Sequence, residues 1–234
     1  MSDAEKPDPD PSKDPQRWPY WSAQAVEATG AWAEKRRLAT AMRAVIERLV
    51  TTDAPEDELH AAADALERYA ARLERHPRRT RPVGFAESAN AGSVVGFFDY
   101  SPLIGRSNPL APPLTMGVDG KRVRGTAVFG AAYEGPPGHV HGGFVAAAFD
   151  EVLGFAQSMG GNPGMTGTLT IRYRKPTPLH REIRMEGEIT RIEGRKIFTV
   201  GRMYAGEVLT AEAEGIFISV DLFKMRALAD AAKR

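Results

Sequence analysis

The chain has no cysteine among its 234 residues, which excludes disulfide bonds, thiol catalysis and cysteine-ligated metal sites. Its formal net charge is only +1, so it carries no general signal for binding nucleic acid or another polyanion. It also lacks any apolar run approaching the ~20 residues that cross a bilayer, so no membrane span is expected. The acidic, proline-rich N-terminus has no apolar segment typical of a signal peptide. The expected location is therefore the cytoplasm.

The composition changes along the chain and predicts four segments. Residues 1–17 hold five acids, three bases and four prolines, a composition typical of a disordered tail. Residues 18–82 are predicted to form a helical hairpin with its linker. Residues 83–221 are predicted to form the main domain and residues 222–234 a C-terminal tail. This length is sufficient for one well-packed core plus an appendage.

Two apolar stripes at helical spacing predict the hairpin. The stripe within residues 22–51 consists of Leu38, Met42, Val45 and Leu49. The stripe of the second helix consists of Leu59, Ala63, Leu66, Ala70 and Leu73. Asp53 is the expected N-cap of this second helix, and Pro55 lies near its first turn. The hairpin could pair with another copy of the chain or cover part of the main domain, and both alternatives stay open.

The main domain has the pattern of one helix and several antiparallel strands. Two extended runs around Asp119-Gly120, within residues 114–130, predict a β-hairpin. A helix is expected over residues 143–158, and a turn at Asn162-Pro163-Gly164 follows it. The strands expected after this turn cover residues 166–175, 182–192, 195–205 and 207–220. Such an order predicts an α+β domain with the helix on one face of the sheet.

The most informative stretch runs from Gly135, through a loop of glycine and proline, into a helix that is apolar on almost every side. Such a helix belongs in a protein interior. It nevertheless carries Asp150 and Glu151, and a buried carboxylate is costly unless it is paired or used. Gly143 and Asp150 are seven residues apart and share one helix face, whereas Glu151 is turned roughly 100° away.

The Gly143 amide lies in the first turn of this helix, where backbone N–H groups lack intrahelical partners. A helix N-terminus favours negative charge, including the charge that develops on an oxyanion. Seven residues rise roughly 10 Å along the axis, which is too far for Gly143 and Asp150 of one helix to act on a single carbonyl. The spacing therefore favours a site that two subunits share.

In this order and at these spacings, the residues resemble the hotdog-fold acyl-CoA thioesterases, in the branch related to phenylacetate-degradation thioesterases. The resemblance extends from about residue 108 to residue 220. Its parts are Asn108 to Pro113, the His-Gly-Gly step at 141–143 with its acid nine positions after the histidine, Thr166 with the strand 168–176, and the turn 193–196. It implies a hotdog fold, in which a curved antiparallel sheet wraps one long helix. It also implies a homodimer or a dimer of dimers, with sites at the subunit interface.

The resemblance further implies that the protein hydrolyses an acyl-CoA thioester to the free acid and coenzyme A. Asp150 would be the general base or nucleophile, and the Gly143 amide would polarise the thioester carbonyl. Thr166 would place the water or steady the acid. His141 is expected to orient the loop or to line the site through a hydrogen bond. The residues that would lie where similar proteins hold the phosphates of coenzyme A are Arg172, Arg174, Arg195 and Lys196.

Several alternatives accompany this interpretation. His139 and His141 lie near two acids, but a catalytic zinc site needs three protein ligands; no metal or redox cofactor is expected. Glu151 is the alternative catalytic acid, and the alternating arginines are also typical of a solvated strand face. Hotdog hydratases and dehydratases use a different acid–histidine motif, which this chain lacks. A non-catalytic acyl-CoA-binding or scaffold protein remains possible, because the helical hairpin would suit an interaction role.

Overall fold

The computed structural model describes residues 28–77, 99–112, 114–160 and 164–219. The predicted tails at residues 1–17 and 222–234, and most of the predicted linker, lie outside the described residues.

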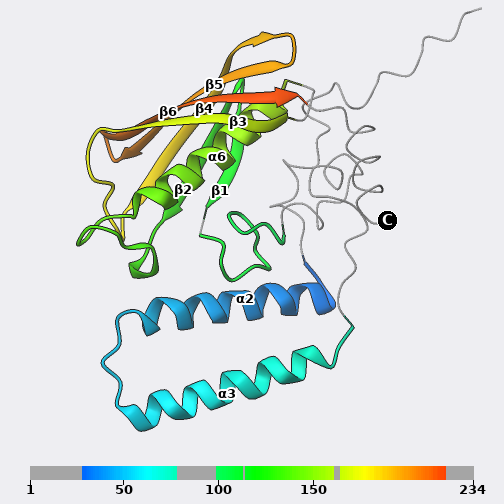
Figure 1. Ribbon diagram of the computed structural model, residues 1–234, viewed down its shortest axis with the longest axis vertical. Helices are drawn as coiled ribbons and strands as arrows, with labels where there is room; N and C mark the ends of the chain where they lie inside the picture. The colour runs from blue at the N-terminus through cyan, green and yellow to red at the C-terminus, as the bar shows by residue number, and fades with distance from the viewer. Residues whose placement is uncertain (1–27, 78–98, 113, 161–163, 220–234) are drawn as a thin grey trace, which may run out of the picture.

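The main domain is a sheet of six antiparallel strands that curves around one helix, α6 (Figure 1). This is the α+β arrangement predicted from the sequence. The elements are β1 (Thr115–Asp119), β2 (Arg122–Val128), α6 (Gly142–Ser158), β3 (Gly164–Tyr173), β4 (Glu182–Glu193), β5 (Lys196–Ala205) and β6 (Val208–Ser219). The strand order is β1-β2-β4-β5-β6-β3. After α6, the chain therefore reaches the edge of the sheet opposite β1, where β3 pairs with β6.

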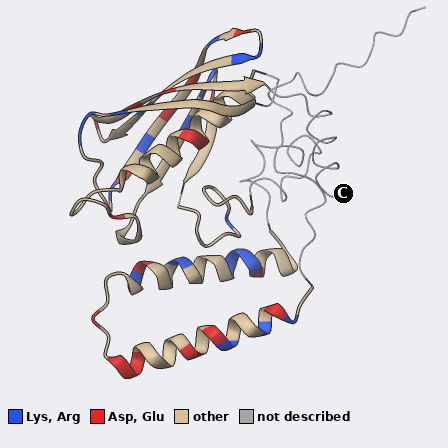
Figure 2. Ribbon diagram, in the orientation of Figure 1, with Lys and Arg blue, Asp and Glu red and all other residues tan. Residues whose placement is uncertain are grey.

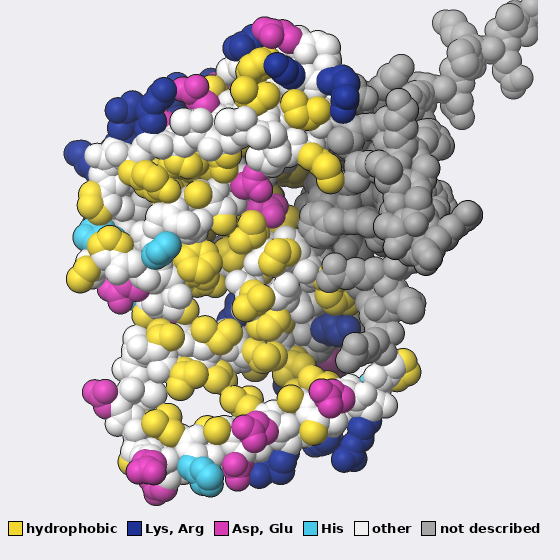
Figure 3. Space-filling model, viewed as in Figure 1, with side chains coloured by type: hydrophobic (Ala, Val, Ile, Leu, Met, Phe, Trp, Pro, Cys, Tyr) yellow, Lys and Arg dark blue, Asp and Glu magenta, His cyan; other side chains and the backbone are white. Residues whose placement is uncertain are grey.

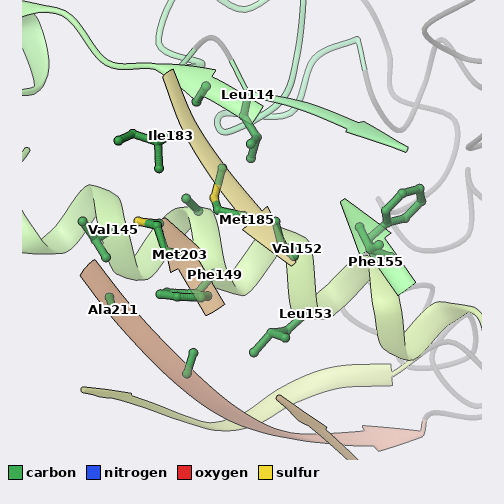
Figure 4. Packing of buried hydrophobic residues seen from close by; sticks show 14 of the residues in the cluster. Leu114, Val145, Phe149, Val152, Leu153, Phe155, Ile183, Met185, Met203 and Ala211 are labelled. Atoms are coloured by element: carbon green, nitrogen blue, oxygen red, sulfur yellow. The ribbon is translucent and has the colours of Figure 1, made fainter. Parts of the chain in front are cut away.

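The core lies between α6 and the inner face of the sheet (Figure 4). Strands β2, β4, β5 and β6 alternate buried and more exposed residues, as expected for strands with one face on a core. Phe149, Val152 and Leu153 of the helix are fully buried against this face. Gly187 of β4 and Gly201 of β5 lie directly beneath them, and a β-carbon at Gly187 would come within 2.9 Å of a Val152 methyl group. These glycines let the helix approach the sheet closely.

The predicted helical hairpin is present as α2 (Gly30–Leu49) and α3 (Glu56–Glu74). The prediction that Asp53 caps the second helix is wrong: Pro55 occupies the N-cap position, and none of the described side chains caps this terminus. Helix α2 lies between the main domain and α3 (Figure 1). Among the described residues, none on α3 is buried.

Polar contacts along its length fasten α2 to the main domain. Near its start, Arg36 donates to the buried carboxylate of Asp99 at 2.6 and 2.8 Å. Near its middle, Arg43 donates to the backbone carbonyl of Asn108 at 2.9 Å. Near its end, the carboxylate of Glu47 accepts hydrogen bonds from the amides of Ala131 and Ala132, at 2.7 and 3.0 Å. These amides begin the short 3-10 helix η3 (Ala131–Tyr133), which leads into the His-Gly-Gly loop.

Candidate active site

The loop before α6 is held by its own backbone. Gly135 donates to the carbonyl of His139 at 2.9 Å, and His139 donates to that of Pro136 at 2.8 Å. Gly138 has φ +74°, a left-handed conformation that favours glycine. Its amide donates to the carboxylate of Glu134 at 2.6 Å. The Gly-Pro-Pro-Gly sequence therefore forms a closed turn that delivers the chain to the start of α6.

His141 is the N-cap of α6, and its Nδ1 accepts a hydrogen bond from the Gly143 amide at 3.0 Å. A ring nitrogen that accepts a hydrogen bond carries no proton, so this geometry corresponds to a neutral imidazole with its proton on Nε2. His141 is exposed, and its backbone amide donates to the carbonyl of Tyr133 at 2.9 Å. The amide expected to polarise a carbonyl is thus engaged by the histidine side chain.

Asp150 and Thr166 meet directly. The Thr166 hydroxyl donates to Oδ1 of Asp150 at 2.8 Å. Asp150 is half-buried on α6, and Thr166 lies near the beginning of the edge strand β3. The register of β3 against β6 shifts between Thr166 and Thr168, and such a bulge re-aims a side chain. The helix and the edge strand together therefore hold one oxygen of this carboxylate.

Glu151, the neighbouring acid, has a different environment. Burial, with a smaller effect from the charge of Asp150, raises its pKa from the ordinary value of 4.5 to about 7. A carboxyl group with such a pKa is largely protonated below neutral pH. The two acids therefore differ in their surroundings: Asp150 accepts a hydrogen bond from Thr166, whereas Glu151 is the more deeply buried of the two.

Tyr173, which sequence reasoning did not assign to the site, contacts the start of α6. Its hydroxyl donates to the carbonyl of Gly142 at 2.9 Å, and its ring lies where a β-carbon at Gly142 would come within 3.4 Å. The available signal was the alternation along β3, which places Tyr173 on the opposite face from Arg172 and Arg174. Thr166 and Tyr173 thus connect the two ends of β3 to the helix that carries Asp150.

The structure does not bring the four predicted phosphate-binding residues into one cluster. Arg172 pairs with Glu214 at 2.6 Å and Arg174 with Glu212 at 2.7 Å, all on the outer face of the sheet. Arg195 and Lys196 lie near the other end of β3. There, the Arg195 side chain donates to the backbone carbonyl of Ser219 on β6 at 3.1 Å. Gly164 and Lys196 have neighbouring partners on β6, Ser219 and Ile218. This second cationic pair is therefore separated from the Thr166 end of β3 by one strand.

Two further properties of the described residues bear on function. No three of their histidine and acidic side chains gather as a metal ion would require. His139 instead places Nδ1 2.8 Å from the carbonyl of Pro137. None of the described helices combines the length and the apolar character needed to cross a bilayer.

Comparison with known proteins matches the same part of the chain. The model of the thioesterase superfamily matches residues 137–212, from the loop before α6 to strand β6. Acyl-coenzyme A thioesterase THEM4 of Xenopus laevis is 36% identical over 93 residues, which are 39% of this chain and 42% of that protein. Human acyl-coenzyme A thioesterase THEM5 is 30% identical over 95 residues, 40% of this chain and 38% of that protein. The match therefore spans only about two fifths of the length of these curated relatives.

A solved structure extends the similarity over most of the chain. The crystal structure of protein RHA08564, a thioesterase superfamily protein, shares 35% sequence identity and superposes with a TM-score of 0.70. The similarity covers 79% of this chain and 94% of that chain. The curved sheet around α6 is accordingly the hotdog fold expected from the sequence, with two helices added before it. By fold and by sequence, the chain belongs to the thioesterase superfamily.

Proposed function

We propose that the protein is an acyl-CoA thioesterase, which hydrolyses an acyl-CoA thioester to a carboxylic acid and free coenzyme A. The observation that carries the proposal is the hydrogen bond of 2.8 Å from Thr166 to Asp150. It holds one oxygen of a half-buried carboxylate on α6 and leaves the other oxygen to act as a general base. The curated relatives that match this region are named as acyl-CoA thioesterases, which supports the substrate class.

In the proposed reaction, Asp150 acts on a water molecule or on the thioester itself. Thr166 occupies Oδ1 of the carboxylate and leaves Oδ2 to accept the proton of water. The water oxygen bonds to the carbonyl carbon, the carbon–sulfur bond breaks, and the departing thiolate takes the proton from the aspartic acid. Direct attack by the carboxylate would instead break the carbon–sulfur bond, release the coenzyme A thiolate and form an acid anhydride; water then hydrolyses the anhydride, which restores the carboxylate and supplies the proton that the thiolate takes. Thr166 steadies the carboxylate in both routes.

The Gly143 amide is proposed to stabilise the oxyanion. It now donates to Nδ1 of His141 at 3.0 Å, so a substrate carbonyl must replace the imidazole as the acceptor. The imidazole is exposed, so in the proposed complex it would turn toward solvent. The first turn of α6 then offers a backbone donor and the positive end of the helix dipole to the developing negative charge.

A second subunit is proposed to complete the site. Gly143 and Asp150 lie on one helix, separated by a rise of roughly 10 Å. Strand β3, which carries Thr166, pairs with β6 on one side and has no neighbour among the described strands on the other. Most of its residues are exposed, and an exposed edge strand can pair with a strand of another chain. Pairing of two β3 edges would bring α6 of each subunit close to the other.

The cationic residues are proposed to hold the phosphates of coenzyme A. Ile218 of β6 lies between Lys196 and Met165, so Arg195 and Lys196 are separated from the Thr166 end of β3 by one strand. Arg172 and Arg174 pair with exposed or half-buried glutamates, so a phosphate would have to displace these partners. Exposed ion pairs contribute little, about 0–1 kcal/mol, and a phosphate that binds an arginine through two hydrogen bonds can replace them.

The test is release of coenzyme A from short, long and aromatic acyl-CoA substrates. Asp150→Asn should lower kcat by about 10²- to 10⁴-fold, the range typical of a lost general base. Glu151→Gln is the matched control, since it makes the same change one position along the helix and should keep activity. Thr166→Ser, which retains the hydroxyl, should remain more active than Thr166→Ala. Full turnover in Asp150→Asn would refute the assignment, and acyl-CoA binding without any turnover in the wild type would indicate a binding protein.

A further inference from the structure

Tyr173 forms a hydrogen bond to the peptide group that carries the proposed oxyanion donor. Its hydroxyl donates to the carbonyl of Gly142 at 2.9 Å. The carbonyl of Gly142 and the N–H of Gly143 belong to one planar peptide unit, whose carbon–nitrogen bond has partial double-bond character. The hydroxyl of Tyr173 therefore acts on the N–H of Gly143 through the peptide bond.

The bulge in β3 turns Tyr173 toward α6 together with Thr166. The two residues are seven positions apart, so in a regular strand they would point to opposite faces of the sheet. The register shifts just after Thr166, and the partners of Thr166 and Tyr173 on β6 are Phe217 and Ala211. These partners are six positions apart and are both buried in the core. One face of β3 thus presents both hydroxyls to the helix.

Neither partner in this hydrogen bond depends on the other to be satisfied. Tyr173 is 56% exposed, so water could serve its hydroxyl. The Gly142 carbonyl lies in the first turn of α6, where a carbonyl accepts the amide four residues ahead and keeps a second lone pair. Burial therefore does not explain why the hydroxyl meets this carbonyl. Its effect on the peptide group does.

A hydrogen bond to a carbonyl oxygen draws electrons toward that oxygen and leaves the N–H of the same peptide more positive. Successive hydrogen bonds of this kind strengthen one another by about 10–30%. Apart from its two acids, α6 carries no charged side chain (Figure 2). Its first turn therefore offers an anion only backbone N–H groups and the helix dipole, and the strength of one N–H matters more.

The first turn of α6 is also accessible to a ligand. Gly143 is exposed, as is the imidazole of His141 that now accepts from its amide. Figure 3 shows histidine and acidic side chains of the main domain on one face of the molecule, with hydrophobic side chains between them. An apolar acyl group could lie on such a surface.

We propose that Tyr173 is a positioning residue, which orients and polarises the Gly143 amide for the oxyanion of the thioester reaction. The inference rests on the proposed function. The peptide is now held at its oxygen by Tyr173 and at its N–H by His141. When a thioester carbonyl replaces the imidazole, the tyrosine keeps the peptide plane in place. Both hydrogen bonds strengthen as negative charge grows on the substrate oxygen. Tyr173 keeps its proton throughout, and proton transfer stays with Asp150.

The first experiment measures the peptide itself by NMR and needs no substrate. Glycine labelled with ¹⁵N and with ¹³C at its carbonyl gives directly coupled pairs only where two glycines are adjacent, at residues 142–143 and 160–161. Tyr173→Phe keeps the ring and removes the donor, so the Gly142 carbonyl carbon and the Gly143 nitrogen should move to lower chemical shift. Gly160, beyond the other end of α6, is the internal control. Unchanged shifts at 142 and 143 would overturn the proposal.

The second experiment measures release of coenzyme A. Tyr173→Phe should lower kcat about tenfold, the worth of one hydrogen bond, and leave KM nearly unchanged, because the bond gains strength only as charge develops. A purely structural role would instead lower the thermal stability and change kcat and KM together. Tyr204→Phe is the matched control and should keep activity, since it removes a hydroxyl on β5, where the ring lies against Arg184.

The wild type separates the two claims. If it releases coenzyme A and Tyr173→Phe has the same kcat, this inference is refuted and the proposed function stands. If the wild type turns over none of the substrates, the proposed function fails, and the role of Tyr173 in the reaction fails with it. A lowered kcat together with shifted Gly142 and Gly143 signals would support both.

Discussion

Asp99 offers the sharpest test of how the N-terminal hairpin is fastened to the main domain. It is 2% exposed and accepts hydrogen bonds from Arg36, Trp32 and the Ser107 hydroxyl. Burial alone would raise the pKa of its carboxyl group, but the donors from Arg36, Ser107 and Trp32 outweigh this effect, and the pKa is lowered. Two of these donors come from α2, so the carboxylate joins the helix to the loop before β1.

Asp99→Asn keeps the shape of the side chain and removes its charge. The Arg36 side chain, 13% exposed, then faces a neutral partner. Breaking a buried ion pair by removing one charge costs about 3–5 kcal/mol, and the remaining amide oxygen places this case near the lower end. About 3 kcal/mol corresponds to a factor of roughly 150 in an equilibrium constant. The backbone amides of α2 should therefore exchange with deuterium about 100-fold faster in the variant.

Hydrogen exchange measured by mass spectrometry resolves this local opening. Asp53→Asn, an exposed acid in the turn between α2 and α3, is the matched control and should change nothing. The wild type should loosen in the same way as the pH falls below about 4, because the stabilisation from a carboxyl with a lowered pKa is complete above its unfolded pKa and is lost as the pH falls through its folded pKa. Unchanged protection of α2 in Asp99→Asn, or equal loosening of α6, would refute the reasoning.

Three other changes test the packing and the charges of the main domain and its contact with α2. Gly187→Ala adds a methyl group within 2.9 Å of Val152, so urea denaturation should show a loss of about 1–3 kcal/mol; wild-type stability would contradict the close approach of α6. Glu47→Ala leaves two amides of η3 without their acceptor and should cost about 1–2 kcal/mol in thermal unfolding, whereas Glu47→Gln should lose less. Glu151 has a raised pKa, so its folded form holds a proton that the unfolded chain releases, and stability should fall as the pH rises from about 4.5 to 7. Glu151→Gln should flatten that fall, and an unchanged slope would show that another group causes it.

The elements of the main domain could be predicted from the sequence because their signals are local. The predicted helix at 143–158 is α6 at 142–158, and the predicted hairpin around Asp119-Gly120 is β1 and β2. Strand order is not local, since it depends on which strands pair after the chain has passed over the helix. The ion pairs that occupy Arg172 and Arg174 come from β6, about 40 residues away in sequence. The alternation along β3 predicted that Arg172 and Arg174 share one face of the sheet. It did not predict that glutamates of β6 lie on the same face.

In the candidate site, too, local features could be predicted and features that depend on distant parts of the chain could not. Spacing and resemblance selected Asp150 and Thr166, and the structure brings their side chains together. The bulge that aims Thr166 at the helix falls at Gly167, and a glycine inside a strand often marks a bulge. The direction in which the bulge turns Thr166 depends on the register of β3 against β6 and is not written in the sequence. The sequence likewise did not predict that the side chain of His141 accepts a hydrogen bond from the Gly143 amide. It depends on the side-chain rotamer of the N-cap, which the sequence does not specify.

The N-terminal hairpin and the site are parts of one connected structure. Glu47 at the end of α2 holds the amides that begin η3. The last residue of η3, Tyr133, accepts from the backbone amide of His141 at 2.9 Å and packs its ring edge-on against Phe144, with centroids 4.9 Å apart. Two short steps therefore lead from the helix to the residue that engages the Gly143 amide. Because Glu47 of α2 holds the start of η3, a change in the position of this helix should also reach the amide proposed to stabilise the oxyanion.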